Sequence, residues 1–212
     1  MHISFYLYII AISIIVGLAF FKRLNPPVIR WFVPFLILTL AVEICGMWLR
    51  FHHTNNARLY NVFTSIEFMF YSLVFRQAVD NIRLKKVILY AAIIFPFLVL
   101  LNIIFLQPFT KFHTITFRAG SVMVITWCYL YFRQLMRSEE FAPLFKNPFF
   151  WISTGLLFFY AGSFFFMSSD LLMYINLPYN SDFWFALNDT LNIILYTAFL
   201  ISFVCQIKIT RK

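Results

Sequence analysis

Seven apolar runs, each close to the length of a membrane-spanning helix, constrain the fold of this chain more than any other feature. They cover residues 3–21, 31–49, 60–75, 87–106, 114–132, 149–168 and 183–205. Because an α-helix rises 1.5 Å per residue, about 20 apolar residues cross the hydrocarbon core of a bilayer. The sequence therefore predicts an all-α integral membrane protein, a single transmembrane domain over residues 1–212 with seven spanning helices.

The overall composition favours a bilayer as the main solvent of the chain. Hydrophobic residues make up 62% of it and charged residues only 12%, whereas about a quarter of the residues in a soluble domain are charged. The net charge of +9 would suit a nucleic-acid partner, but the basic residues are spread between the apolar runs. We therefore expect no nucleic-acid partner. The three cysteines all lie within apolar runs and predict no disulfide framework.

The distribution of basic residues predicts the orientation in the membrane. Of the 17 Lys and Arg residues, thirteen lie after the first, third and fifth runs or in the tail, and three lie after the second, fourth and sixth. The thirteen are Lys22, Arg23, Arg30, Arg76, Arg83, Lys85, Lys86, Arg133, Arg137, Lys146, Lys208, Arg211 and Lys212, and the three are Arg50, Arg58 and Lys111. Since Lys and Arg are enriched in cytoplasmic loops, we expect the N-terminus outside and the C-terminus in the cytoplasm, across the inner (plasma) membrane.

Small residues and prolines predict some details of the helices. Gly155 and Gly162 are seven residues apart and share a helical face, so a second helix can approach closely there. Pro96 falls inside the run 87–106 and predicts a kink. The first run lacks a basic start and a small-residue cleavage site, so we expect a helix of the mature protein and not a signal peptide.

The run 60–75 contains a carboxylate, Glu67. A charged side chain at the bilayer centre costs roughly 2.5–3.5 kcal/mol on insertion scales, so it needs a partner, a proton or a wet cavity. At helical spacing Tyr60, Thr64, Glu67 and Tyr71 share one face. We therefore expect this face to point inward, and Glu67 to be the residue that responds to a ligand or a proton.

Other polar residues of the apolar runs fall in the same outer half of the predicted membrane domain. Scattered singly, their unsatisfied groups would each cost several kcal/mol, so we predict that they converge in one water-accessible pocket open to the outside. Its candidate ligand-binding residues are Glu43, Tyr60, Glu67, Tyr71, Asn102, Arg118, Asp189 and Asn192. We further expect Arg118 to pair with Glu43, Glu67 or Asp189.

The balance of charge in this set leaves several kinds of chemistry open. Three acids face one deeply placed cation, so at least one carboxylate must be protonated, paired with Arg50 or available to a ligand. Such a pocket suits a small cationic or hydrogen-bonding molecule, a metal ion or a proton. All four histidines lie on the outer side, but no fixed spacing of metal ligands and no GxSxG turn occurs, so we assign neither a metal, a cofactor nor a catalytic residue. Structural ion pairs between helices remain an alternative for these acids.

Three stretches, residues 55–75, 149–166 and 188–192, resemble uncharacterised bacterial seven-helix membrane proteins, which are similar to the membrane-sensor halves found with histidine kinases. The chain departs from that arrangement because no kinase or output domain follows Cys205. Better-defined seven-helix families fit poorly. The last run has no Lys for a rhodopsin Schiff base, and Asn188 and Asn192 stand where ceramidase-related hydrolases have histidines. Small sugar transporters carry more prolines within their helices.

Together these features predict a small-molecule or pH sensor that signals to a cytoplasmic partner through its basic loops. Those loops would serve equally for topology and for contact with anionic lipid. A proton-coupled or small-molecule transporter, with Glu67 and Asp189 as the titrating pair, is the main alternative, and an intramembrane enzyme is a third. The inner half of the runs offers few polar groups to line a transport path, which favours a sensor.

Overall fold

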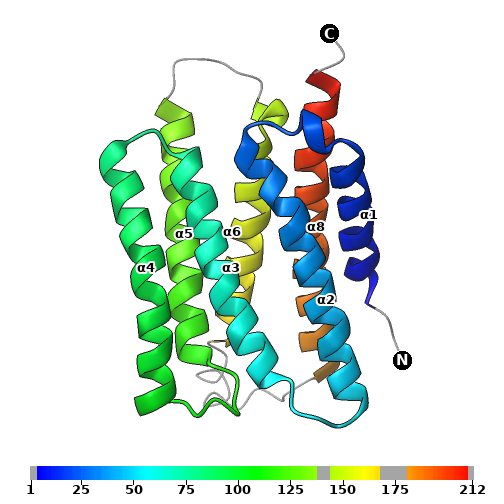
Figure 1. Cartoon of the computed structure of the whole chain (residues 1–212), viewed down its shortest axis with the longest axis vertical. Helices are drawn as coiled ribbons and strands as arrows, with labels where there is room; N and C mark the ends of the chain where they lie inside the picture. Colours follow the sequence, from blue (N-terminus) through cyan, green and yellow to red (C-terminus); the bar gives the residue numbers. More distant parts are fainter. Residues whose placement is uncertain (1–3, 138–143, 168–180, 210–212) are drawn as a thin grey trace.

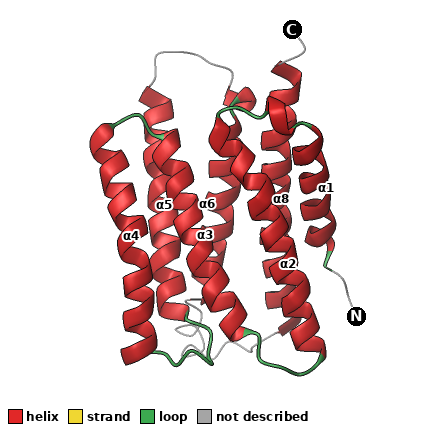
Figure 2. Cartoon of the chain, viewed as in Figure 1, coloured by secondary structure: helices red, strands yellow, loops and turns green. Residues whose placement is uncertain are grey.

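The chain folds into a bundle of long helices packed side by side (Figure 1). A computed structural model describes residues 4–137, 144–167 and 181–209. Its helices are α1 (Phe5–Ala19), α2 (Phe32–Phe51), α3 (Ala57–Ala78), α4 (Ile82–Phe105), α5 (Thr114–Arg137), α6 (Pro148–Met167) and α8 (Ser181–Ile209). Short 3-10 turns cover Phe21–Arg23, Pro27–Trp31 and Leu144–Lys146, and no strand occurs within the described ranges (Figure 2). The prediction of an all-α fold is confirmed for this part of the chain.

Successive helices run in opposite directions, so the connections gather at the two ends of the bundle (Figure 1). The helices α1, α3 and α5 finish at the end of the bundle where α8 also finishes, and α2, α4 and α6 finish at the other end (Figure 1). α8 packs against α6 and α1, and α3 packs against α4, α5 and α2. α4 lies at the edge of the bundle, where it contacts α3 and α5. Eleven of the thirteen basic residues identified above therefore belong to one end, which we call the basic end; Arg211 and Lys212 lie outside the described residues.

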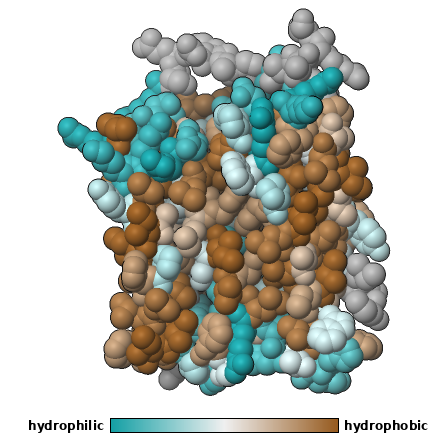
Figure 3. Space-filling view, in the orientation of Figure 1, coloured by the Kyte–Doolittle hydropathy of each residue, from teal (hydrophilic) through white to brown (hydrophobic). Residues whose placement is uncertain are grey.

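Five helical segments are long and apolar enough to cross a membrane. They are Pro27–Phe51, Ile82–Phe105, Thr114–Arg137, Pro148–Phe165 and Phe185–Gln206. α1 is apolar but shorter, and α3 is long but carries several polar residues. On the face shown in Figure 3, hydrophobic residues cover the middle of the bundle and hydrophilic residues gather towards its two ends.

Several helices extend beyond the apolar runs that predicted them. α3 begins at Ala57 and continues to Ala78, and α8 continues to Ile209. The backbone hydrogen bonds of a helix do not require apolar side chains, so polar residues at the ends of a run continue the helix. α4 likewise continues through Pro96 from Ile82 to Phe105.

Aromatic side chains fill the centre of the bundle around α3. Phe35 of α2 stacks on Phe70 of α3, with ring centroids 4.0 Å apart and ring planes 9° apart. On another side of α3, Phe68 packs edge-on against Phe95 of α4. Phe68 also depends on Gly120 of α5, because a Cβ at Gly120 would lie 2.3 Å from the Phe68 ring. This packing fixes the rotation of α3 and hence the direction of its polar face.

The close approach predicted at Gly155 and Gly162 is confirmed, and the approaching helix is α8. A Cβ on Gly155 would lie 2.7 Å from the Cβ of Ala198 and 3.3 Å from the backbone oxygen of Leu195. A Cβ on Gly162 would lie 2.7 Å from the side chain of Leu191. Glycine at these two positions therefore lets α6 and α8 approach more closely than larger residues would allow.

Replacing Gly155 should separate these two helices. Gly155→Val places new methyl groups against Ala198 and the α8 backbone, which cannot yield without moving the helix. We expect a loss of about 1–3 kcal/mol, as is usual for overpacking, visible as a lower melting temperature in detergent. Ala119→Val is the matched control, because Ala119 is exposed on α5. Equal melting temperatures of the two variants would contradict the described contact.

Candidate functional site

A polar cavity of about 190 Å³ lies towards the end of the bundle opposite the basic end. Six helices contribute to it, α1, α2, α3, α5, α6 and α8, together with the connection before α5. The cavity therefore lies within the bundle and not between one pair of helices. Its lining residues are Tyr6, Glu43, Arg50, Tyr60, Phe63, Thr64, Glu67, Phe112, Phe117, Phe159, Ser163, Met167, Asn188, Asn192 and Tyr196. It combines carboxylates, hydroxyls and amides with a wall of aromatic rings.

Glu43 joins three helices through one carboxylate oxygen. Its Oε2 accepts a hydrogen bond of 2.8 Å from the Tyr6 hydroxyl on α1 and one of 3.2 Å from the Tyr60 hydroxyl on α3. Gly46, one turn along α2, makes room for Tyr60, because a Cβ there would lie 2.4 Å from the Tyr60 hydroxyl oxygen. The Tyr6 ring stacks on Tyr196 of α8, with centroids 6.0 Å apart. Tyrosines of α1 and α3 therefore hold Glu43 in place, and Tyr196 of α8 packs against the ring of Tyr6.

Glu67 has fewer partners than Glu43. The Tyr71 hydroxyl donates to Glu67 Oε1 at 3.5 Å, the long end of hydrogen-bond distances. No hydrogen bond to the other oxygen, Oε2, is found among the described residues. The ring of Tyr71 lies 6.0 Å from that of Tyr160, and both tyrosines are fully buried. The Tyr160 hydroxyl has no hydrogen-bond partner within the described ranges.

Neither carboxylate is neutralised by a directly bound cation in the part of the chain that the structure describes. No Lys, Arg or His forms an ion pair with Glu43 or Glu67 there. Arg50 lines the same cavity from the exposed end of α2, and its positive charge acts on Glu43 without an ion pair. Asp189 lies close enough to Glu43 to add a second negative charge to its surroundings. The site is therefore rich in acceptor oxygens and poor in positive charge.

The structure brings together part of the set predicted from the sequence. Glu43, Tyr60, Glu67 and Asn192 line the cavity, and Tyr71 supports Glu67 from behind. The side-chain amide of Asn192 donates to the backbone oxygen of Asn188 at 2.9 Å.

The other three predicted residues do not line the cavity. Asn102 is buried on α4, where its amide donates to Gln107 Oε1 at 3.2 Å, and the position of α4 at the edge of the bundle keeps it away from Glu67. Arg118 donates from Nε and from its Nη2 to the backbone oxygen of Met167 at the end of α6. These bonds do not go to the acids expected from the sequence; the last carbonyl oxygens of a helix are a favourable site for a cation. Asp189 is partly exposed, beside the cavity and not in its wall.

Sequence reasoning missed several residues of the cavity. Tyr6 and Tyr196 are the most important of them, because Tyr6 binds Glu43 directly and Tyr196 supports its ring. Phe63, Phe117 and Phe159 form much of the wall. The sequence has 30 Phe and 11 Tyr residues, so their presence marks no particular site. A search for tyrosines placed at the depth of a buried acid would have found Tyr6.

The connection between α4 and α5 is anchored beside the cavity by Asn61. The Asn61 amide donates to the backbone oxygen of Lys111 at 2.8 Å, and its Oδ1 accepts from the backbone nitrogen of His113 at 2.9 Å. This arrangement buries His113, whose side chain is 3% exposed. Neither ring nitrogen of His113 has a hydrogen-bond partner among the described residues. Burial lowers the pKa of His113 because it disfavours the charged ring.

Neither a metal site nor a relative helps to assign the chemistry. Within the described ranges no three His, Cys, Asp or Glu side chains come together as a metal-binding group. Comparison of the chain with protein-family models, curated proteins and solved structures found no match. The cavity must therefore be interpreted from its own residues.

Removal of one hydroxyl tests the described geometry of Glu43. Tyr6→Phe deletes the 2.8 Å hydrogen bond and keeps the stacking on Tyr196. We expect a loss of about 1–2 kcal/mol in the free energy of unfolding, measured by thermal unfolding in detergent. Tyr8→Phe is the matched control, since Tyr8 lies on the same helix and is exposed. If both variants melt at the same temperature, Tyr6 does not bind Glu43.

His113 should make the stability of the protein depend on pH. Since the folded state favours the neutral ring, its contribution is complete at pH values above the ordinary histidine pKa of about 6.5 and is lost as the pH falls through that value. His113→Phe should flatten the melting temperature between pH 7.5 and pH 5, whereas His52→Phe, at an exposed position, should leave the wild-type slope. An unchanged slope in His113→Phe would contradict this assignment.

Proposed function

We propose that this protein spans a membrane seven times, with the N-terminus outside, and that its cavity binds a small cationic molecule as the input of a receptor or sensor. Five helices of sufficient length and apolarity support the membrane location. The strong bias of basic residues to one end supports the orientation. In that orientation the cavity opens to the outside and the basic end faces the cytoplasm, where a signalling partner would have access to it.

The ligand class is inferred from two carboxylates, Glu43 and Glu67, which line an aromatic cavity and form no ion pair with any described Lys, Arg or His. Transfer of an uncompensated charge into an apolar bundle is costly, and a bound cation would offset that cost. Tyr6, Tyr60 and Phe63 surround the same space as Glu43, and aromatic rings attract organic ammonium groups through their faces. A cavity of about 190 Å³ accommodates only a small molecule.

The packing beyond the cavity favours a receptor over a transporter. Towards the basic end, large side chains that are fully buried fill the centre of the bundle, among them Phe32, Tyr71, Tyr160, Phe199 and Phe203. A carrier must open its site to both sides of the membrane, which would require all of these rings to move. A receptor needs only a change in how the helices around Glu43 and Glu67 pack.

Loss of one cavity carboxylate should abolish binding. Purified protein is titrated with small ammonium ions, from methylammonium to tetramethylammonium, with thermal shift and equilibrium binding as readouts. Glu67→Gln removes the charge and keeps the size, and we expect affinity to fall by about tenfold or more. Asp189→Asn is the control, because it removes the same charge beside the cavity; its affinity should change by about threefold or less.

The outcome is decisive when the unliganded variants melt normally, which shows that they are folded. The proposal fails if the wild type binds none of the ammonium ions. It also fails if Glu67→Gln binds them as well as the wild type does.

A further inference from the structure

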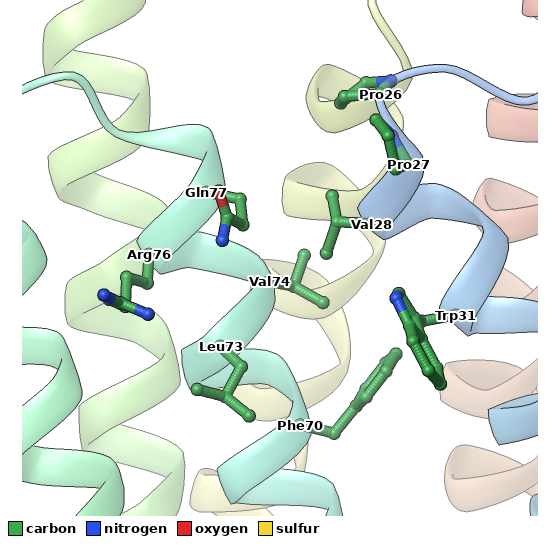
Figure 4. A pocket seen from close by; sticks show the side chains of 9 residues that line it. All are labelled: Pro26, Pro27, Val28, Trp31, Phe70, Leu73, Val74, Arg76 and Gln77. Atoms are coloured by element: carbon green, nitrogen blue, oxygen red, sulfur yellow. The ribbon is translucent and has the colours of Figure 1, made fainter.

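A second hollow lies at the basic end of the bundle, between the start of α2 and the last turns of α3 (Figure 4). It is a groove of about 610 Å³ that shares no lining residue with the polar cavity, and its first lining residue on α3, Phe70, follows Glu67 by about one helical turn. The turn Pro27–Trp31 forms one wall, and Phe70, Leu73 and Val74 form the other. The close-up shows the Trp31 ring beside that of Phe70, with Val28 opposite Val74 (Figure 4).

The groove is apolar along most of its length and ends at a cation. Arg76 and Gln77 of α3 line it at the side nearest the basic end. The Nε atom of Arg76 is buried and has no hydrogen-bond partner within the described ranges. A guanidinium forms strong, charge-assisted hydrogen bonds with anionic oxygens, so an anion that approached Arg76 in the groove would be stabilised. The described contacts supply the apolar walls and the charge but not that acceptor.

The position of the groove matches the boundary between the apolar band and the hydrophilic end of the molecule. Trp31 is 65% exposed at the groove and Leu73 is 43% exposed. Tryptophan is enriched at the level of lipid headgroups, and exposed leucine is expected where acyl chains are the solvent. Arg83 and Lys85, at the start of α4, belong to the same basic end. The surrounding charge therefore favours an anionic occupant.

We propose that this groove is a binding site for a phospholipid with an anionic headgroup. One acyl chain lies along Trp31, Phe70 and Leu73, and the phosphate accepts a hydrogen bond from the Arg76 guanidinium. Basic pockets between membrane helices on the cytoplasmic side bind such headgroups in general. Free phosphate would make no contact with the apolar walls, and a lipid without net negative charge would be attracted less strongly to Arg76. The site requires that the bundle lie in a bilayer, but it does not require that the polar cavity bind a ligand.

Binding is measured on the full chain by exchange of a fluorescent phosphatidylglycerol between detergent micelles and the protein, with fluorescent phosphatidylcholine and inorganic phosphate as the comparison probes. Arg76→Met removes the charge and keeps most of the aliphatic stem, and we expect it to weaken phosphatidylglycerol binding by about tenfold. Arg76→Lys should retain most of the affinity. Arg83→Met, which removes a charge at the same end but outside the groove, should leave it within about twofold.

A further variant tests the apolar half of the groove. Leu73→Trp introduces a larger ring at an exposed position of the wall, so it should exclude the acyl chain and weaken both lipids without unfolding the protein. The proposal is overturned if Arg76→Met and Arg83→Met lose affinity equally, because the attraction is then diffuse. It is also overturned if phosphatidylcholine binds as tightly as phosphatidylglycerol, if inorganic phosphate competes fully, or if Leu73→Trp binds both lipids normally.

Discussion

The placement of Glu43 and Glu67 inside an otherwise apolar bundle is the constraint on which the rest of this structure depends. Burial of a carboxylate is unfavourable unless its oxygens find donors. Glu43 finds two tyrosine hydroxyls, one from α1 and one from α3, and Glu67 finds Tyr71 of its own helix. The hydrogen bonds of Glu43 join α1, α2 and α3 at this depth, whereas the bond of Glu67 lies within α3.

α3 links the features of functional interest. Near its beginning Asn61 anchors the connection that precedes α5, in its middle Glu67 faces the polar cavity, and near its end Arg76 borders the apolar groove. α3 is long enough to cross a membrane, but its polar residues make it less apolar than the five segments named above. Its partners α4, α5 and α2 bury its aromatic residues. A change in the cavity would therefore reach the basic end most directly through α3.

The sequence predicted the helices well, because length and apolarity alone define them. It also predicted the shared face of Tyr60, Thr64 and Glu67, since helical spacing is fixed. It could not predict which helices are neighbours. Two residues predicted to reach the cavity therefore have other partners: Asn102 donates to Gln107 at the edge of the bundle, and Arg118 donates to the backbone oxygen of Met167. Depth in the membrane can be read from one helix, but rotation and lateral position come from packing. For the same reason Tyr6 could not be distinguished from the many other aromatic residues.

The claim that the cavity is open to the outside and negatively charged is tested most directly by thiol accessibility at Thr64, which lines it. Thr64→Cys is made in a chain whose native cysteines are replaced, and intact cells and inverted vesicles are treated with membrane-impermeant thiol reagents. A cationic trimethylammonium reagent should modify it from outside at least about tenfold faster than an anionic sulfonate reagent, while Ser72→Cys, fully buried, stays unmodified. Modification from the cytoplasmic side alone, or equal rates with both reagents, would contradict the account.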